Sequence, residues 1–214
     1  LSGMMEQVYH IIGRGGLFSI IRQIMHDQAK YAGYYDDRSA DTPDYLGSIQ
    51  EIDLKALTSY FIAIGGEPNM LFRGKLLSML RDKQKTRLNC VSPKAHIYNN
   101  ARVGGGNIIM PFAHIGSQCT IGDGNILYSG VIIEHDSVLG NNINIAPGVK
   151  TGGSCVINDN VFLGIWSTLK DGITIGEGAL IGAGSLVLND VPPHTIVYGS
   201  PAKVIGANTI YRTV

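Results

Sequence analysis

A hydrophobic position recurs every six residues through the second half of the chain. From Ile97 to Val187, sixteen successive sixth positions are aliphatic, with Thr151 as the one exception. A period of six fits neither the 3.6-residue turn of a helix nor the two-residue alternation of a strand, so it indicates a repeat architecture. One short strand and one corner per hexad, with three hexads per coil, predict a triangular parallel β-helix of about five coils.

The remaining hexad positions support the same interpretation. Half of the residues that follow an aliphatic position are glycine, where the chain turns without a Cβ penalty. The fourth position after each aliphatic residue is usually small or β-branched. This pattern resembles the hexapeptide repeat of left-handed β-helices, which are rare exceptions to the right-handed crossover rule. Because no insertion interrupts the register, a ligand must use the faces of the prism, its ends or a groove between subunits.

The first part of the chain has a different pattern and predicts a second domain. Hydrophobic runs alternate with helical segments in the order strand, helix, strand, strand, helix, strand, which predicts a small parallel α/β sheet. We therefore expect an α/β domain over residues 6–91, a left-handed β-helix over 92–206, and a C-terminal tail to 214. The predicted strands are 8–12, 31–35, 60–64 and 88–91, and the predicted helices run from the glycine-rich turn to about 28 and from about 69 to 81.

Candidate binding residues follow the predicted strands of this domain. In open parallel sheets, ligands bind beyond the carboxyl ends of the strands. Glycines let backbone N–H groups approach an anion at a helix N-terminus, and carboxylates accept hydrogen bonds from a ribose or a base. The candidates are Gly13, Arg14, Gly15 and Gly16 after the first strand, Asp36 and Asp37 after the second, and Gly65 after the third.

The glycine-rich turn does not match a dinucleotide fingerprint. Phe18 stands where the GxGxxG motif requires its last glycine, and about 85 residues are few for NAD. A mononucleotide or a nucleotide-sugar fits this domain better. The alternative is that the glycines form only a tight turn.

Composition excludes some partners. The chain has 17 basic and 17 acidic residues and no basic run, which argues against nucleic acid. No apolar stretch approaches the roughly 20 residues that span a bilayer. The three cysteines are scattered, as packing thiols in a reducing cytoplasm would be, so we expect a cytoplasmic protein without a membrane span.

His135 is the candidate for catalysis, since it stands between Glu134 and Asp136 and outside the inward positions of its hexad. A neutral imidazole is a good proton acceptor, and a neighbouring carboxylate fixes its tautomer. The other interpretation is a solvated surface histidine.

Both halves of the chain together resemble one family, the NeuD/PglD-like sugar acyltransferases. The resemblance covers the chain after Met5 and rests on several separated segments. These are residues 11–16, Asp36-Asp37, Ala63-Ile64-Gly65, Ile133-Glu134-His135-Asp136 and Gly199-Ser200-Pro201-Ala202-Lys203.

The resemblance implies a homotrimer that binds acetyl-CoA, with no metal, in the groove between neighbouring prisms. It implies that His135 is the general base, that Asp136 increases its basicity, and that the Gly153 N–H faces the thioester oxygen. Ile165 and Ala183 match positions that line the coenzyme groove. It also implies that the α/β domain holds the nucleotide-sugar through the glycines and aspartates named above.

Two positions depart from the family pattern. Asn144 stands nine residues after His135, where the family commonly has a histidine near the acetyl group, and an amide there donates a hydrogen bond without shuttling a proton. Leu17 stands in the glycine-rich turn where a histidine is frequent.

The sequence therefore predicts an acetyl-CoA-dependent N-acetyltransferase. Its expected acceptor is a UDP- or dTDP-linked 4-amino-4,6-dideoxy sugar used in surface polysaccharide or glycan biosynthesis. The first alternative is O-acetylation of sialic acid or another sugar. Further alternatives are a zinc hydratase, which needs three converging histidines, and a non-catalytic scaffold.

Overall fold

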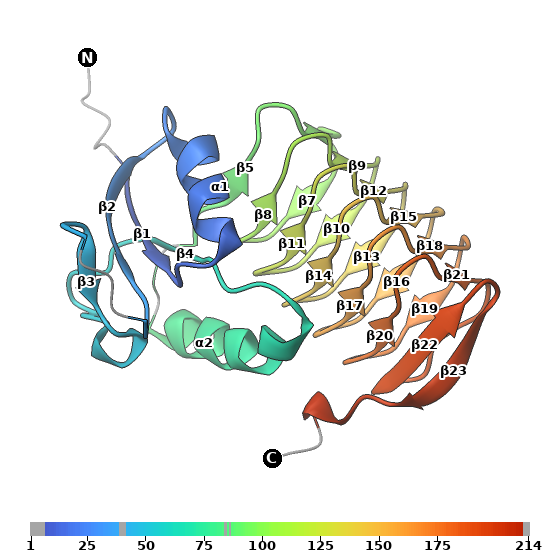
Figure 1. The fold of residues 1–214 in the computed structure, drawn as a ribbon. Coiled ribbons are helices and arrows are strands. Elements are labelled where there is room, and N and C mark those ends of the chain that lie inside the picture. The colour runs from blue at the N-terminus through green and yellow to red at the C-terminus, as the bar shows by residue number, and fades with distance from the viewer. Residues whose placement is uncertain (1–6, 39–41, 84, 86, 212–214) are drawn as a thin grey trace.

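The computed structural model describes residues 7–38, 42–83, 85 and 87–211. A small α/β unit packs against one side of a long prism, and a β-hairpin lies at the C-terminal end of the prism (Figure 1). Residue 6 of the predicted first domain and the end of the predicted tail lie outside the described residues.

The α/β unit contains a four-stranded parallel sheet in the order β3-β2-β1-β4. One helix follows the first strand and a second follows the last. The strands are β1 (Val8–Ile12), β2 (Lys30–Tyr35), β3 (Tyr45–Gly47) and β4 (Tyr60–Ile62), the α-helices are α1 (Gly16–Met25) and α2 (Met70–Asp82), and the 3₁₀ turns of the chain are η1 (Ile49–Glu51), η2 (Glu67–Asn69) and η3 (Thr209–Tyr211).

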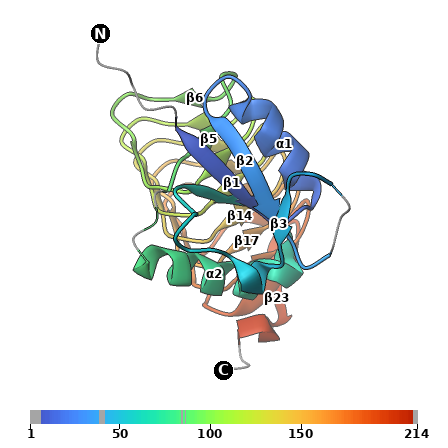
Figure 2. The same cartoon turned by 90° about the vertical axis from the view of Figure 1, so that its left-hand side faces the viewer.

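The two faces of this sheet pack against different partners. Tyr9 and Ile11 of β1 belong to a cluster with α1 and the prism, whereas Ile12 belongs to a cluster with Leu76 and Leu80 of α2. This alternation follows from the period of two along a strand. The helix α1 thus lies between the sheet and the prism (Figure 1), and the view turned by 90° has the α/β unit in front of the coils (Figure 2).

The prism is a left-handed parallel β-helix with three sheets, as the hexad pattern predicts. We call them sheets 1, 2 and 3. Sheet 1 has the strand order β23-β22-β20-β17-β14-β11-β8-β5, sheet 2 has β21-β18-β15-β12-β9-β6, and sheet 3 has β19-β16-β13-β10-β7.

Nearly all of these strands are two residues long. They are β5 (Cys90–Val91), β6 (His96–Ile97), β7 (Arg102–Val103), β8 (Ile108–Ile109), β9 (His114–Ile115), β10 (Thr120–Ile121), β11 (Ile126–Leu127), β12 (Ile132–Ile133), β13 (Val138–Leu139), β14 (Asn144–Ile145), β15 (Lys150–Thr151), β16 (Val156–Ile157), β17 (Phe162–Leu163), β18 (Thr168–Leu169), β19 (Thr174–Ile175), β20 (Leu180–Ile181) and β21 (Leu186–Val187), with the closing hairpin β22 (Thr195–Gly199) and β23 (Ala202–Ala207).

Each residue of the six-residue pattern ends one of these strands and points inward. Ile109 and Ile133 are fully buried, and only Ile97 and Val103 at the first coil are partly exposed. Neighbouring strands pair residues eighteen apart, as Ile126 does with Ile108 (126 − 108 = 18). Three hexads therefore make one coil, and the aliphatic residues of successive coils stack into one continuous core.

Two expectations for the α/β unit are corrected. The strand near 88–91 is β5, which pairs with β8 in the prism and not with the small sheet. Cys90 stands eighteen residues before Ile108, so it pairs with Ile108 in the register of the repeat. The fourth strand of the small sheet is instead β3, whose three residues Tyr45-Leu46-Gly47 are too short to show an alternation. The predicted ends near Gln28 and Ile64 also shorten to Met25 and Ile62.

The two domains share a buried boundary. Cys90, Ile108 and Ile126 of sheet 1 pack with residues of α1 and of the small sheet in one hydrophobic cluster. On the other side, Arg73 of α2 is 1% exposed and donates from Nε to Oδ1 of Asn142 at 2.6 Å. These contacts hold the α/β unit at a defined place on the prism.

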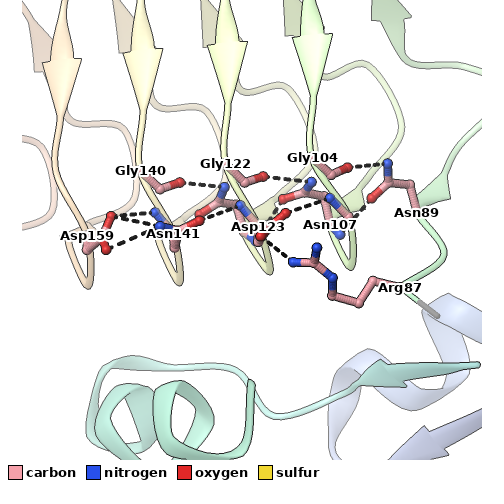
Figure 3. A network of polar contacts seen from close by, with 11 residues as sticks. Arg87, Asn89, Gly104, Asn107, Gly122, Asp123, Gly140, Asn141 and Asp159 are labelled. Carbon is pink, nitrogen blue, oxygen red and sulfur yellow. Dashed lines mark hydrogen bonds and ion pairs between the residues drawn. The ribbon is translucent and has the colours of Figure 1, made fainter. Parts of the chain in front are cut away.

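A row of buried asparagines runs along one edge of the prism (Figure 3). Asn125 is 0% exposed, and its Nδ2 donates to the carbonyl oxygen of Gly140 at 2.9 Å. Its Oδ1 accepts from the N–H of Ile143 at 2.7 Å, and its own N–H donates to Oδ1 of Asn107 at 2.8 Å. Each amide therefore satisfies backbone groups of the next coil, which a buried corner requires.

We predict that Asn125→Ala destabilises the protein by roughly 2–6 kcal/mol, because it leaves two buried backbone groups without partners at about 1–3 kcal/mol each. Denaturant unfolding at fixed protein concentration measures the change. Asn99→Ala, at an exposed position, is the matched control and should change little. Equal stability of the two variants would show that the asparagine row does not support the corner.

Candidate functional site

A cavity of about 560 Å³ lies at the carboxyl ends of the strands of the small sheet. All seven residues proposed from the sequence as substrate contacts line it. Gly13 has a φ of +95°, and a Cβ there would lie 2.6 Å from Ile64, so the turn after β1 requires glycine. The residues proposed from the sequence are Gly13, Arg14, Gly15, Gly16, Asp36, Asp37 and Gly65.

The two aspartates also hold the loops around this cavity. Asp36 is 5% exposed, and its carboxylate accepts from the N–H of Arg14 at 2.6 Å and of Arg38 at 2.8 Å. Asp37 accepts from the N–H of Ile49 at 2.9 Å. Replacing Asp36 therefore changes the shape of the cavity as well as its charge. Asp37 is exposed and keeps lone pairs for a ligand.

Tyr128 was not identified from the sequence and also lines the cavity. It follows β11 of the prism, and its hydroxyl group lies 2.8 Å from the position of a Cβ on Gly65. Burial raises the pKa of Tyr128, and the nearby Arg73 opposes that rise, so the phenol stays protonated near neutral pH. The only sequence signal was a tyrosine where many hexads have glycine. Residues of both domains therefore line this cavity.

His135 and Asp136 form a hydrogen-bonded pair at another part of the prism. Nδ1 of His135 lies 2.7 Å from Oδ2 of Asp136, and both side chains are exposed. Asp136 has a φ of +58°, a conformation that aspartate tolerates better than most residues. Because Asp136 engages Nδ1, the imidazole keeps Nε2 available for a proton from elsewhere.

The ring of His135 lies against Gly153 in the next coil. A Cβ on Gly153 would be 2.6 Å from both Cε1 and Nε2 of the imidazole, so only glycine admits the ring in this position. The N–H of Gly153 has no hydrogen-bond partner among the residues that the structure describes. A free donor thus lies beside the free nitrogen of the histidine.

The other residues proposed for the coenzyme lie elsewhere on the prism. We call the turns 116–119, 134–137 and 152–155, between sheets 2 and 3, the His135 corner. The turns 128–131, 164–167 and 182–185, between sheets 1 and 2, form the Tyr128 corner. Ile165 and Ala183 are in the Tyr128 corner, and Ile165 is 49% exposed. The two corners occupy opposite edges of sheet 2.

Asn144 occupies a third environment, on strand β14 of sheet 1. It is 2% exposed and stacks between Ile126 and Phe162. Its Oδ1 is buried without a hydrogen-bond partner in the described part of the chain. The proposed contact of Asn144 with the coenzyme therefore stays a prediction.

The cysteines and the remaining histidines do not form a second reactive site. Burial raises the pKa of the Cys90 thiol to about 12 and also raises that of Cys119, so these thiols stay protonated at neutral pH. His114 stacks on His96 with ring centroids 5.4 Å apart. Over residues 7–38, 42–83, 85 and 87–211, no group of three or more histidine, cysteine or acidic side chains is placed to hold a metal ion. Among these residues no helix has the length and apolarity needed to cross a membrane.

The repeats match a known family. The bacterial transferase hexapeptide pattern (six repeats) covers residues 100–135 and 154–189. Serine acetyltransferase 4 of Arabidopsis thaliana is 43% identical over 86 residues, which is 36% of this chain and 24% of that protein. The chain thus spans about a quarter of the length of the curated relatives it matches first.

Solved structures share the whole two-domain fold. PerB from Caulobacter crescentus, in complex with CoA and GDP-perosamine, is 27% identical with a TM-score of 0.84, and the match covers 95% of this chain and 99% of that one. WeeI from Acinetobacter baumannii AYE is 25% identical with a TM-score of 0.80, covering 93% and 100%. These similarities confirm the fold and the resemblance to sugar acyltransferases.

We predict that Gly153→Ala displaces the His135 imidazole, because a methyl group cannot share the space of the ring. The Cε1–H signal of His135 in a ¹H–¹³C spectrum should shift while the thermal unfolding midpoint stays close to that of the unaltered protein. Gly206→Ala is the control, since a Cβ there has no neighbour within 4 Å. An unshifted signal in Gly153→Ala would contradict the close packing of ring and glycine.

Proposed function

We propose that this chain is a hexapeptide-repeat sugar acyltransferase that transfers an acetyl group from acetyl-CoA to the amine of a nucleotide-linked amino sugar. The observation that carries this proposal is the arrangement at the His135 corner. There Nδ1 of the imidazole engages Asp136, and the ring lies against Gly153, whose N–H is free. A base and an oxyanion donor side by side are what acyl transfer needs.

In the proposed step, the neutral sugar amine attacks the thioester carbonyl directly. His135 accepts the amine proton at Nε2 as the new C–N bond forms, and the Gly153 N–H stabilises the tetrahedral oxyanion. The C–S bond then breaks, and the proton passes from the imidazolium to the coenzyme thiolate. A backbone donor of this kind typically lowers the activation free energy by about 3 kcal/mol. Protonated, buried thiols favour this direct route over an acyl-enzyme.

The cavity of the α/β unit suits the nucleotide half of the acceptor. Backbone N–H groups at the start of α1 and the guanidinium of Arg14 offer charge to a diphosphate, and Asp37 offers acceptors to a sugar or base. The finer proposal is a UDP- or dTDP-linked 4-amino-4,6-dideoxy sugar. The PerB complex carries a GDP-linked sugar, so guanosine-linked acceptors belong in the same assay, together with free sialic acid and serine.

The active particle is proposed to be a trimer with sites shared between chains. Within one chain, His135 and Gly153 lie on one edge of sheet 2, while Tyr128, Ile165 and Ala183 lie on the opposite edge. Packing prisms side by side brings the His135 corner of one chain toward the Tyr128 corner of its neighbour. Base, coenzyme groove and nucleotide cavity then meet at each interface.

We expect Arg14→Ala to raise KM for the nucleotide-sugar about ten- to a hundred-fold, because a charge-assisted hydrogen bond contributes roughly 1.5–3 kcal/mol. The KM for acetyl-CoA should barely change. Steady-state kinetics with each substrate varied in turn measures both constants, and Arg22→Ala, at a residue that does not line this cavity, is the control. An unchanged KM for every nucleotide-sugar, with acetylation of free sialic acid, would favour the O-acetyltransferase alternative.

Alone, His135→Ala should lower kcat by about 10²–10⁴-fold, because it removes the general base. Ile165→Asp should block the coenzyme groove from an exposed position. Because the two residues would come from different chains, co-assembled trimers of both variants should regain part of the activity. Activity that stays absent in the mixture would place each site within a single chain. Near-normal turnover by His135→Ala would show that His135 is not the general base.

A further inference from the structure

Thr151 breaks the aliphatic column of the prism at the coil that follows His135. The equivalent positions in the coils before and after it are Ile133 and Leu169. Thr151 is 4% exposed, so a hydroxyl group is placed in a core that otherwise uses methyl groups. Burying a hydroxyl group is unfavourable unless it forms a hydrogen bond. The position therefore calls for a reason other than packing.

The hydroxyl group replaces a backbone acceptor next to His135. At the equivalent turns of the coils before and after, the residue that follows the inward aliphatic position donates its N–H to a backbone carbonyl of the next coil. The acceptor is the carbonyl oxygen of the inward residue there. Gly116 donates to Ile133 in this way at 2.8 Å. Gly152 donates to Leu169 likewise, also at 2.8 Å. At Glu134 the partner is instead Oγ1 of Thr151, at 3.1 Å.

Strand pairing changes at the same place. Along the prism, the two-residue strands of adjacent coils pair at both residues, as β9 does with β12. Between β12 and β15 the pairing is limited to Ile132 with Lys150. The backbone therefore departs from the strict repeat at Glu134, one residue before the histidine.

The carbonyl group of Glu134 also forms a hydrogen bond with a side chain of the core. The thiol of Cys119 donates to the carbonyl oxygen of Glu134 at 3.1 Å. Burial keeps that thiol protonated by raising its pKa, so it remains a donor. Cys155 makes the same contact two coils later (155 − 119 = 36), with the carbonyl oxygen of Lys170 at 3.2 Å, so this feature belongs to the repeat. The hydrogen bond from Glu134 to Thr151 is what distinguishes the turn that carries His135.

We infer that Thr151 is a positioning residue, which sets the backbone of Glu134 so that the His135 ring lies over Gly153. Its effect on rate rests on the proposed function, whereas its effect on the ring does not. An enzyme whose base is displaced by a fraction of an ångström still folds and still binds its substrates. Its imidazole is then less often in position to accept the amine proton. Side-chain placement at this scale is known to change rates strongly.

The test uses Thr151→Val, which restores the aliphatic column with almost the same volume. We expect kcat to fall about ten-fold with KM for acetyl-CoA nearly unchanged. The thermal unfolding midpoint should change little, because the Glu134 N–H can then donate to the carbonyl oxygen of residue 151, as Gly116 and Gly152 donate at their corners. Thr151→Ser keeps the acceptor and should restore kcat. The control Ile145→Val, elsewhere in the column, should lower the midpoint and leave kcat unchanged.

A second readout needs no substrate. The Cε1–H signal of His135 and the Glu134 amide signal should move in Thr151→Val and stay near their original positions in Thr151→Ser. Moved signals in a protein that acetylates no nucleotide-linked sugar would support the positioning role and count against the proposed function alone. Unmoved signals with unaltered kcat in Thr151→Val would overturn the inference.

Discussion

Backbone hydrogen bonds between successive coils fix the position of every turn of the prism. Gly116 donates to Ile133 seventeen residues later (133 − 116 = 17), and the same spacing recurs along the prism. Because each coil is bonded to the next in this way, every corner residue stacks on residues eighteen positions away. The coils cannot slide without breaking the whole column. The residues proposed for function lie where the sequence departs locally from the repeat.

The residues proposed for catalysis are such exceptions. His135 and Asp136 occupy corner positions where the repeat imposes no side chain, and Gly153 lies below the ring because the next coil is in register. Asp136 adopts a left-handed conformation that the corner turn demands, and this orientation directs its carboxylate to Nδ1 of the histidine. The rigid repeat thus holds an exposed pair of side chains in a defined geometry, as a preorganised base requires.

The α/β unit depends on the prism for its position and for part of its cavity. Ile108 and Ile126 of sheet 1 complete the hydrophobic cluster beneath α1, and Tyr128 supplies one wall beside Gly65. The small sheet alone would expose the apolar side of α1 and leave this cavity open on the prism side. Docking on sheet 1 therefore forms the core and the proposed nucleotide site together. In the same way, Arg73 and Asn142 join α2 to the prism.

Local patterns in the sequence were enough to predict the prism, the strands β1, β2 and β4, and the seven residues proposed for the glycine-rich cavity. Those features follow from local periods and strand ends, which a chain displays in order. The folded structure was needed to show that β5 joins the prism, that β3 completes the small sheet, that Asp36 accepts hydrogen bonds from the loops around it, and that Thr151 accepts one from Glu134. These depend on contacts between distant segments, where packing geometry and unsatisfied backbone groups choose the partner, and no local period encodes that choice.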